Sequence, residues 1–90
     1  MIEITGFVTG SPAGREIGRR GYLHVMIELA PWWAGDEEHY ETLLIHMDMD
    51  WDLVGAWIET DPGQFVRATA EKIDFGPDGP DALCTTIDWR

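Results

Sequence analysis

The amino-acid sequence predicts an all-β fold, a five-stranded Greek-key barrel with one short α-helix between the third and fourth strands. Three observations predict it. Several short segments alternate apolar and polar residues, turns rich in glycine and proline separate them, and one segment changes to a helical pattern. The chain has 90 residues, of which 44% are hydrophobic. We therefore expect a single domain, residues 1–90, with an ordered core.

The first two strands are predicted near the N-terminus. Ile2, Ile4 and Val8 alternate with polar residues, and this segment ends in the turn-rich stretch TGSPAGREIGRRG, residues 9–21. In YLHVMIEL, residues 22–29, the apolar residues at 23, 25, 27 and 29 fall on one face. This period of two is the clearest strand pattern in the chain. The following APWWAGDEEHY, residues 30–40, is predicted to be a loop.

The next segment, ETLLIHMD at residues 41–48, fits two patterns. As a strand it turns Leu43, Ile45 and Met47 inward, and as a helix it forms an apolar stripe that includes Leu44. We favour the strand, because the preceding loop ends without a clear helix cap and the neighbouring strands need a partner. The segment LVGAWIE, residues 53–59, is then predicted to be a short helix, with Asp50 or Asp52 as its N-cap.

The last two strands are predicted in FVRATAEKIDF, residues 65–75, and ALCTTIDW, residues 82–89, with a tight turn between them. The final strand places Leu83, Thr85, Ile87 and Trp89 on one side. The order strand, strand, strand, helix, strand, strand is that of the OB-fold barrel, whose ligands lie across strands 2 and 3 and the flanking loops. We expect a binding face made of the following residues: Tyr22, His24, Met26, Glu28, His46, Asp48, Phe65, Arg67 and Thr69.

The chain is strongly acidic. Its 17 acidic residues against six basic ones give a formal net charge of -11. Such a surface repels phosphate backbones and attracts basic surfaces. Acid-rich chains with few lysines also suit concentrated salt, where charge is screened within about 3 Å at 1 M. The composition therefore indicates a basic partner or a saline environment.

The remaining composition argues against several classes of protein. The single cysteine, Cys84, cannot form an internal disulfide or a thiolate zinc site. No signal-peptide pattern opens the chain, and no apolar run is long enough to cross a bilayer, so we expect a cytoplasmic protein without membrane contact. Ser11 is the only serine and no nucleophile motif surrounds it, so we expect neither an enzyme nor a cofactor.

Two segments resemble the bacterial single-stranded DNA-binding protein family. ITGFVTGSPAGREIGRRGYLHVMIELAPWW, residues 4–33, is similar to that family's opening strand, arm-like loop and second strand. DWDLVGAWIETDPGQFVRATAEKI, residues 50–73, is similar to its short helix, glycine turn and fourth strand. The resemblance implies an OB-fold that binds single-stranded DNA. It places Trp32 or Trp33 at the position of the stacking tryptophan, and the following residues in the first arm: Arg15, Arg19 and Arg20.

Two groups of residues could hold a metal ion. The acids of HMDMDWDLVGAWIE, residues 46–59, match places 1, 3, 5 and 12 of a calcium loop, but place 6 is Leu53 where that loop needs glycine. The acids concerned are Asp48, Asp50, Asp52 and Glu59. We favour capping of the helix instead. His24, His46 and Asp48 could also form a small site on neighbouring strands, although such residues are more often solvated.

These observations leave two hypotheses about function. The first is a non-enzymatic interaction module that binds a basic protein surface, including the case of a nucleic-acid mimic that inhibits a nucleic-acid-handling complex. The alternative is a divergent single-stranded DNA or RNA binder. It would use Trp32, Trp33, Tyr22 and Phe65 for stacking and Arg15, Arg19, Arg20 and Arg67 for phosphates. We favour the first, because repulsion acts on every encounter with a polyanion. The fold also allows a homo-oligomer.

Overall fold

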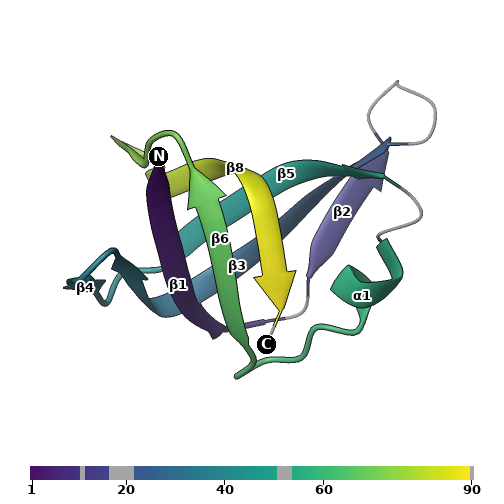
Figure 1. The fold of residues 1–90 in the computed structure, drawn as a ribbon, viewed down its shortest axis with the longest axis horizontal. Helices are drawn as coiled ribbons and strands as arrows, with labels where there is room; N and C mark the ends of the chain where they lie inside the picture. The colour runs from purple at the N-terminus through teal and green to yellow at the C-terminus, as the bar shows by residue number, and fades with distance from the viewer. Residues whose placement is uncertain (11, 17–21, 51–53, 90) are drawn as a thin grey trace.

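The computed structural model describes residues 1–90 except 11, 17–21, 51–53 and 90, and of residues 15, 16, 56, 58 and 89 it describes the backbone alone. The described elements are nearly all strands (Figure 1). In chain order they are β1 (Ile2–Val8), β2 (Ala13–Glu16), β3 (Tyr22–Ala34), β4 (Glu37–His39), β5 (Leu43–Asp50), α1 (Val54–Ile58), β6 (Phe65–Ala70), β7 (Asp74–Gly76) and β8 (Gly79–Trp89).

Five long strands close into a barrel. Strand β1 pairs with β6, β6 with β8, β8 with β5 and β5 with β3, and β3 pairs back onto β1. All of these pairings are antiparallel except the one between β5 and β8, which is parallel. Of the short strands, β2 and β4 each pair with β3, and β7 pairs with β8. The all-β, five-stranded barrel expected from the sequence is confirmed, and its strand order is that of an OB-fold.

The expected helix is reduced to a short segment. Five residues, Val54–Ile58, are helical, which is about one and a half turns. The described chain therefore has no helical layer. Val54 and Trp57 are buried against Leu23, Val25 and Met49, so α1 covers one end of the barrel. Asp50 ends β5 too far before α1 to cap it, and Asp52 lies outside the described residues. Nowhere in the described ranges is a helix long and apolar enough to cross a membrane.

The prediction of a loop at residues 30–40 is wrong. Strand β3 continues to Ala34, and β4 folds back onto it, with Trp32 opposite His39 and Ala34 opposite Glu37. The turn between them is Gly35-Asp36, and Gly35 has a φ of 62°, in the left-handed region that favours glycine. A glycine followed by aspartate between two such strands is typical of a tight hairpin. The hairpin signal was therefore present in the sequence.

The ambiguous segment at residues 41–48 is a strand. It pairs with β3 at eight positions, from Tyr22 opposite Asp50 to Leu29 opposite Leu43. Leu43, Ile45 and the later Met49 are buried. The choice between strand and helix thus follows from the long-range pairing with β3.

The last strand departs from the expected pattern. A register shift beside Thr85 interrupts the pairing of β6 with β8, so that Thr69 faces Thr86 while Ala70 faces Cys84. The alternation of side chains is consequently reversed by the shift: odd-numbered residues point outward before it and inward after it. Leu83 and Thr85 are exposed, Ala82 and Cys84 are buried, and Ile87 packs against the core. The residues expected on one side of this strand are therefore divided between two sides.

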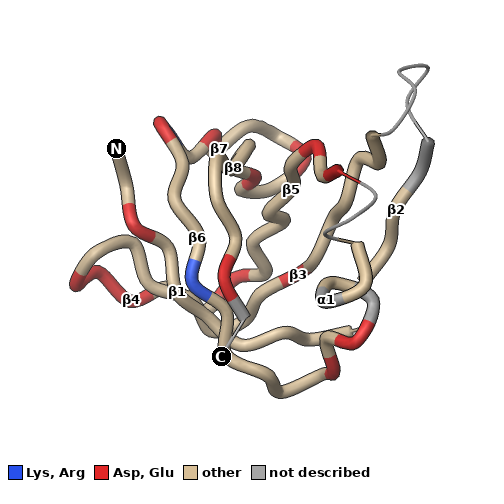
Figure 2. The backbone as a smooth tube through the Cα atoms, turned by 45° about the vertical axis from the view of Figure 1, so that its right-hand side comes forward, with Lys and Arg blue, Asp and Glu red and all other residues tan. Residues whose placement is uncertain are grey.

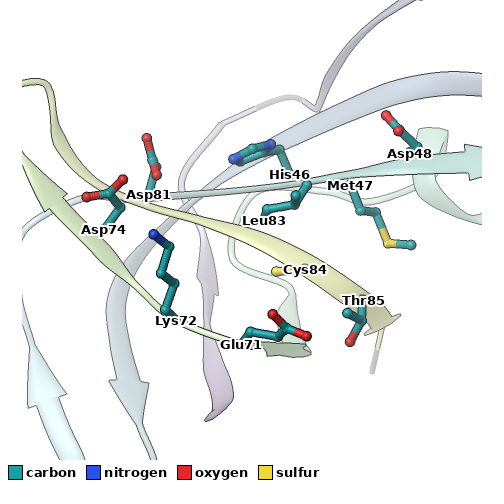
Figure 3. Close-up of a pocket in the computed structure, with 10 residues that line it drawn as sticks. All are labelled: His46, Met47, Asp48, Glu71, Lys72, Asp74, Asp81, Leu83, Cys84 and Thr85. Atoms are coloured by element: carbon teal, nitrogen blue, oxygen red, sulfur yellow. The ribbon is translucent and has the colours of Figure 1, made fainter. Parts of the chain in front are cut away.

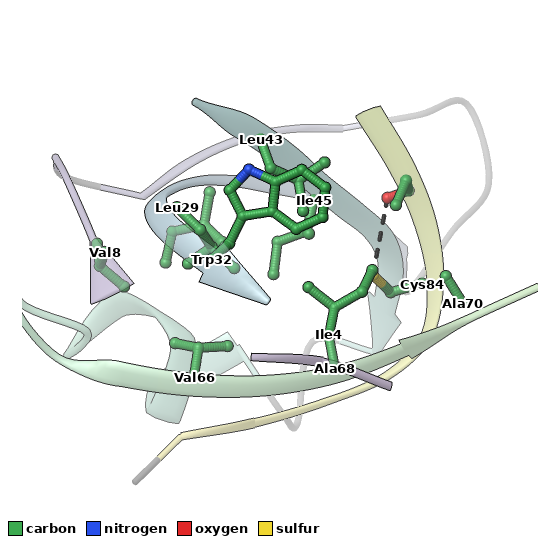
Figure 4. Close-up of a cluster of buried hydrophobic side chains, with 12 residues drawn as sticks. Ile4, Val8, Leu29, Trp32, Leu43, Ile45, Val66, Ala68, Ala70 and Cys84 are labelled. Atoms are coloured by element: carbon green, nitrogen blue, oxygen red, sulfur yellow. Dashed lines mark hydrogen bonds between the residues drawn. The ribbon is translucent and has the colours of Figure 1, made fainter. Parts of the chain in front are cut away.

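The core is built around Trp32, which is fully buried among aliphatic side chains of several strands (Figure 4). Its indole Nε1 donates a hydrogen bond of 2.7 Å to the backbone oxygen of Glu41. The ring stacks on His39 with centroids 4.1 Å apart and planes 9° apart. Trp32 therefore holds the β3–β4 hairpin against the barrel by both a hydrogen bond and ring contact.

Strand β1 lies very close to β3 where the barrel closes. A Cβ atom added to Gly6 would lie 2.9 Å from the Cβ of Trp32 and 3.0 Å from the backbone oxygen of Pro31. Only glycine leaves room for this approach, because backbone atoms cannot move aside without disturbing the strand pairing.

The substitution Gly6→Ala should lower the free energy of unfolding by about 1–3 kcal/mol, because it overpacks the closing seam. Gly10→Ala is the matched control, since a Cβ atom at Gly10 would meet nothing within 4 Å. Urea unfolding followed by tryptophan fluorescence measures both. Equal destabilisation by the two substitutions would contradict this account of the seam.

Candidate functional site

The expected binding face is divided between two sides of the barrel. Strands β3 and β5 are neighbours, whereas β6 lies between β1 and β8. We define the β3–β5 face by the outward residues His24, Met26, Glu28, Leu44, His46 and Asp48, with Asp81 and Leu83 of the adjoining β8. We define the β1–β6 face by Glu3, Thr5, Phe7, Trp33, Phe65, Arg67 and Thr69. Phe65, Arg67 and Thr69 therefore do not share a surface with His24 and His46.

Three aromatic rings meet on the β1–β6 face. The centroid of Phe7 lies 5.4 Å from that of Phe65 and 6.1 Å from that of Trp33, and both pairs meet edge to face. Strand register produces this contact, because Phe7 is paired with Phe65, and Thr5 is paired with Trp33. Phe7 is 37% exposed, and Trp33 and Phe65 are half-buried. We call Phe7, Trp33 and Phe65 the aromatic cluster.

One arginine lies beside the aromatic cluster. Thr5 of β1 is paired with Arg67 of β6 on one side and with Trp33 of β3 on the other. Arg67 and Trp33 are therefore separated by one strand. Its Nε lies 3.8 Å from Oε1 of Glu3, and both side chains are substantially exposed, at 41% and 57%. An exposed ion pair at this distance contributes about 0–1 kcal/mol. Glu3 therefore holds the guanidinium only weakly, and the Nε atom that faces it is buried without a hydrogen-bond partner.

The structure separates the four expected stacking residues. Trp32 is in the core, so its assignment to ligand contact is wrong. Trp33 and Phe65 come together, while Tyr22 lies at the opposite end of β3, paired with Asp50. Phe7 was missed, although its position between the inward Gly6 and Val8 marks it as an outward aromatic residue.

The expected phosphate contacts are placed only in part. Arg19 and Arg20 lie outside the described residues. The backbone of Arg15 is in β2, opposite His24 of β3. Arg67 is on the β1–β6 face. Figure 2 shows acidic positions spread over the strands and turns of the described chain, with little positive charge among them.

A hydrogen-bonded chain of side chains crosses the β3–β5 face. His24 Nδ1 lies 2.7 Å from Oδ1 of Asp48, and His24 Nε2 lies 3.1 Å from Nδ1 of His46. A carboxylate can only accept, so His24 donates from Nδ1 to Asp48, and the bond between His24 Nε2 and His46 Nδ1 runs in the direction that the tautomers of the two rings set. Burial, together with the neighbouring His24, lowers the pKa of His46, and Asp81 and Asp48 oppose this shift. The chain therefore joins two imidazoles and one carboxylate by direct hydrogen bonds.

Neither group of expected metal ligands is arranged around an ion site. Asp48 and Asp50 lie in β5, paired with His24 and Tyr22 of β3, so the first half of the calcium pattern is an extended strand and not a loop. Asp52 lies outside the described residues. Within the described ranges, no three side chains of His, Cys, Asp or Glu are placed to hold a metal ion.

A groove of about 640 Å³ lies beside this face, between β5, β8 and the β6–β7 connection (Figure 3). Its charged lining is mainly acidic: Asp48, Glu71, Asp74 and Asp81, with Lys72 extending toward Asp74 and Asp81. The buried Cys84 also lines it, and burial raises the pKa of that thiol to about 11, against the effect of a hydrogen bond from the backbone of His46. The thiol is therefore uncharged at neutral pH.

The structure resembles a solved OB-type protein. It is similar to a small single-stranded DNA-binding protein from Streptomyces coelicolor, with a TM-score of 0.66 and 14% sequence identity over 99% of this chain and 90% of that one. This confirms the fold-level resemblance to single-stranded DNA-binding proteins. No protein-family model matches the sequence, and no curated protein matches it.

Acidification tests the histidine pair. Because the folded pKa of His46 lies below its unfolded value, the unfolded chain takes up a proton first as pH falls. The contribution of His46 to stability is therefore present above the unfolded pKa, about 6.5, and is lost below it. We expect the free energy of unfolding of His46→Gln to fall less between pH 7 and pH 5 than that of the wild type, as measured by urea unfolding at both pH values. An identical change in the two proteins would contradict the shift.

Proposed function

We propose that this protein binds single-stranded nucleic acid. The observation that carries the proposal is the aromatic cluster with Arg67 beside it on the outside of an OB barrel. Nucleic-acid bases stack on exposed aromatic rings, and each stacked base contributes about 1–3 kcal/mol. The likeness in fold to the Streptomyces coelicolor protein, whose name states that it binds single-stranded DNA, supports the same proposal.

Stacking supplies more of the affinity than charge does. The chain carries a net charge of -11, so a phosphate backbone is repelled at long range. Among the residues that define the β1–β6 face, Arg67 carries the positive charge, and the carboxylate of Glu3 partly offsets that charge. We therefore expect one or two phosphate contacts, each adding about -0.7 to the slope of log affinity against log salt.

A second candidate function is docking on a basic protein surface. The acid-lined groove favours it, because Asp48, Glu71, Asp74 and Asp81 face a single lysine there. Such a surface attracts cationic partners at low salt. Pull-downs with basic nucleic-acid-handling proteins test it, and complexes that survive at low salt but require the groove carboxylates would support it.

Titration with a poly-dT oligonucleotide tests the first candidate. Trp33 is half-buried beside Phe7, whereas Trp32 and Trp57 are buried, so stacking at the aromatic cluster should quench part of the fluorescence. Between roughly 50 and 200 mM salt the affinity should fall by only about 3- to 7-fold, as one or two phosphate contacts imply.

Duplex DNA of the same composition is the control for that titration. Its bases are already stacked on one another, so they cannot lie on the aromatic rings, and we expect little quenching. A flat titration with the single strand, or equal quenching by duplex, would retire the proposal.

A further inference from the structure

Aromatic rings and charges are distributed unequally between the two faces of the barrel. The β3–β5 face presents Glu28, Asp48 and Asp81, and the acid-lined groove adjoins it. The rings on that face are the imidazoles of His24 and His46, which are hydrogen-bonded to each other, and Tyr22 borders it at the end of β3. The β1–β6 face presents three rings, of which Phe7 contacts both Trp33 and Phe65, with Arg67 close to Glu3. A polyanion that needs stacking surfaces is therefore better matched by the β1–β6 face.

We infer that a single nucleic-acid strand lies across β1 and β6, on the aromatic cluster, and not across strands β3 and β5, where ligands of OB barrels usually lie. This inference rests on the proposed function and names the surface that performs it. Trp33 and Phe65 flank Phe7 and offer ring surface to bases. Arg67, which is paired with Thr5 of β1, offers a guanidinium to a phosphate.

The arrangement of the strands makes this surface rigid. Trp33, Phe7 and Phe65 come from three strands that are hydrogen-bonded to one another, β3, β1 and β6. Behind them Trp32, Ile4 and Val66 are fully buried, so the rings rest on packed core. Little conformational entropy is then lost when a base stacks on them, since the rings are already held in place.

A second copy of this chain is the competing occupant, and the size of the patch disfavours it. A stable protein interface buries about 800 Å² on each partner. An aromatic side chain buries about 150–250 Å² in full, and Trp33 and Phe65 are already half-buried. Thr5 and Thr69 interrupt the surface, and Glu3 and Arg67 charge its edge. The cluster is large enough for a few bases and small for a dimer.

Truncation of the rings tests the inference. We expect Phe65→Ala and Phe7→Ala to weaken the binding of a fluorescein-labelled poly-dT strand by about fivefold or more each, measured by anisotropy. Leu83→Ala and His46→Gln are the controls on the other side of the barrel, where Leu83 is 60% exposed, and they should leave the affinity unchanged. Circular dichroism establishes that each variant is folded.

Addition of charge provides a second test that does not depend on removing packed rings. Thr5→Lys places a cation between Trp33 and Arg67, and Leu83→Lys adds the same charge on the β3–β5 side. Thr5→Lys should tighten binding and steepen the log–log salt slope by about 0.7. Leu83→Lys should change the slope by much less.

The outcomes distinguish the inference from the function on which it rests. If the wild type binds no single strand, the proposed function fails and the inference fails with it. If the wild type binds, and the substitutions at Leu83 and His46 weaken binding while those at Phe7 and Phe65 do not, only the inference is overturned. Light scattering that shows a dimer, dissociated by Phe65→Ala without change in binding per chain, would assign the cluster to a second copy and also overturn it.

Discussion

The closure of β1 onto β3 is the constraint on which the rest of the molecule depends. Gly6 lies against Trp32 and Pro31 with no room for a side chain, and this contact joins the first strand to the C-terminal part of the longest one. Once β1 is in that position, its other edge pairs with β6 and the sheet becomes a ring. Closure removes the open edge that a five-stranded sheet would otherwise expose. The same pairing sets Phe7 beside Phe65 and Thr5 beside Trp33.

Adjacent tryptophans consequently have opposite roles. Trp32 is enclosed by the core, with its N–H bonded to Glu41 and its ring stacked on His39. Trp33 points to the outer surface and meets Phe7. A strand turns successive side chains to opposite sides, so the first ring stabilises the fold and the second lies at the surface, where the proposed ligand would stack. In a chain of net charge -11, the proposed binding surface would rely on rings more than on positive charge.

The β3–β5 face has a different character from the aromatic one. A hydrogen-bonded chain runs across it from Asp48 through His24 to His46, burial lowers the pKa of His46, and the adjoining groove is lined by carboxylates. A second proton on the histidine pair would set two cations against each other across 3.1 Å. The lowered pKa of His46 therefore limits the positive charge on this face, and its carboxylates are unfavourable to phosphate. The two sides of the barrel differ in chemistry although they share one fold.

The sequence by itself determined the alternation of residues 22–29 in β3, because the period of two depends only on neighbours along the chain. Residues 41–48 fitted a helix as well, and pairing with β3 decided that they form a strand. The sequence could also have revealed the Gly35-Asp36 hairpin and the outward position of Phe7, which local rules contain. Only the tertiary structure decided that Trp32 is the buried member of its pair, that the final strand changes sides beside Thr85, and that Phe7, Trp33 and Phe65 meet. Those outcomes depend on strand order and register, which are set by contacts between residues distant in the chain.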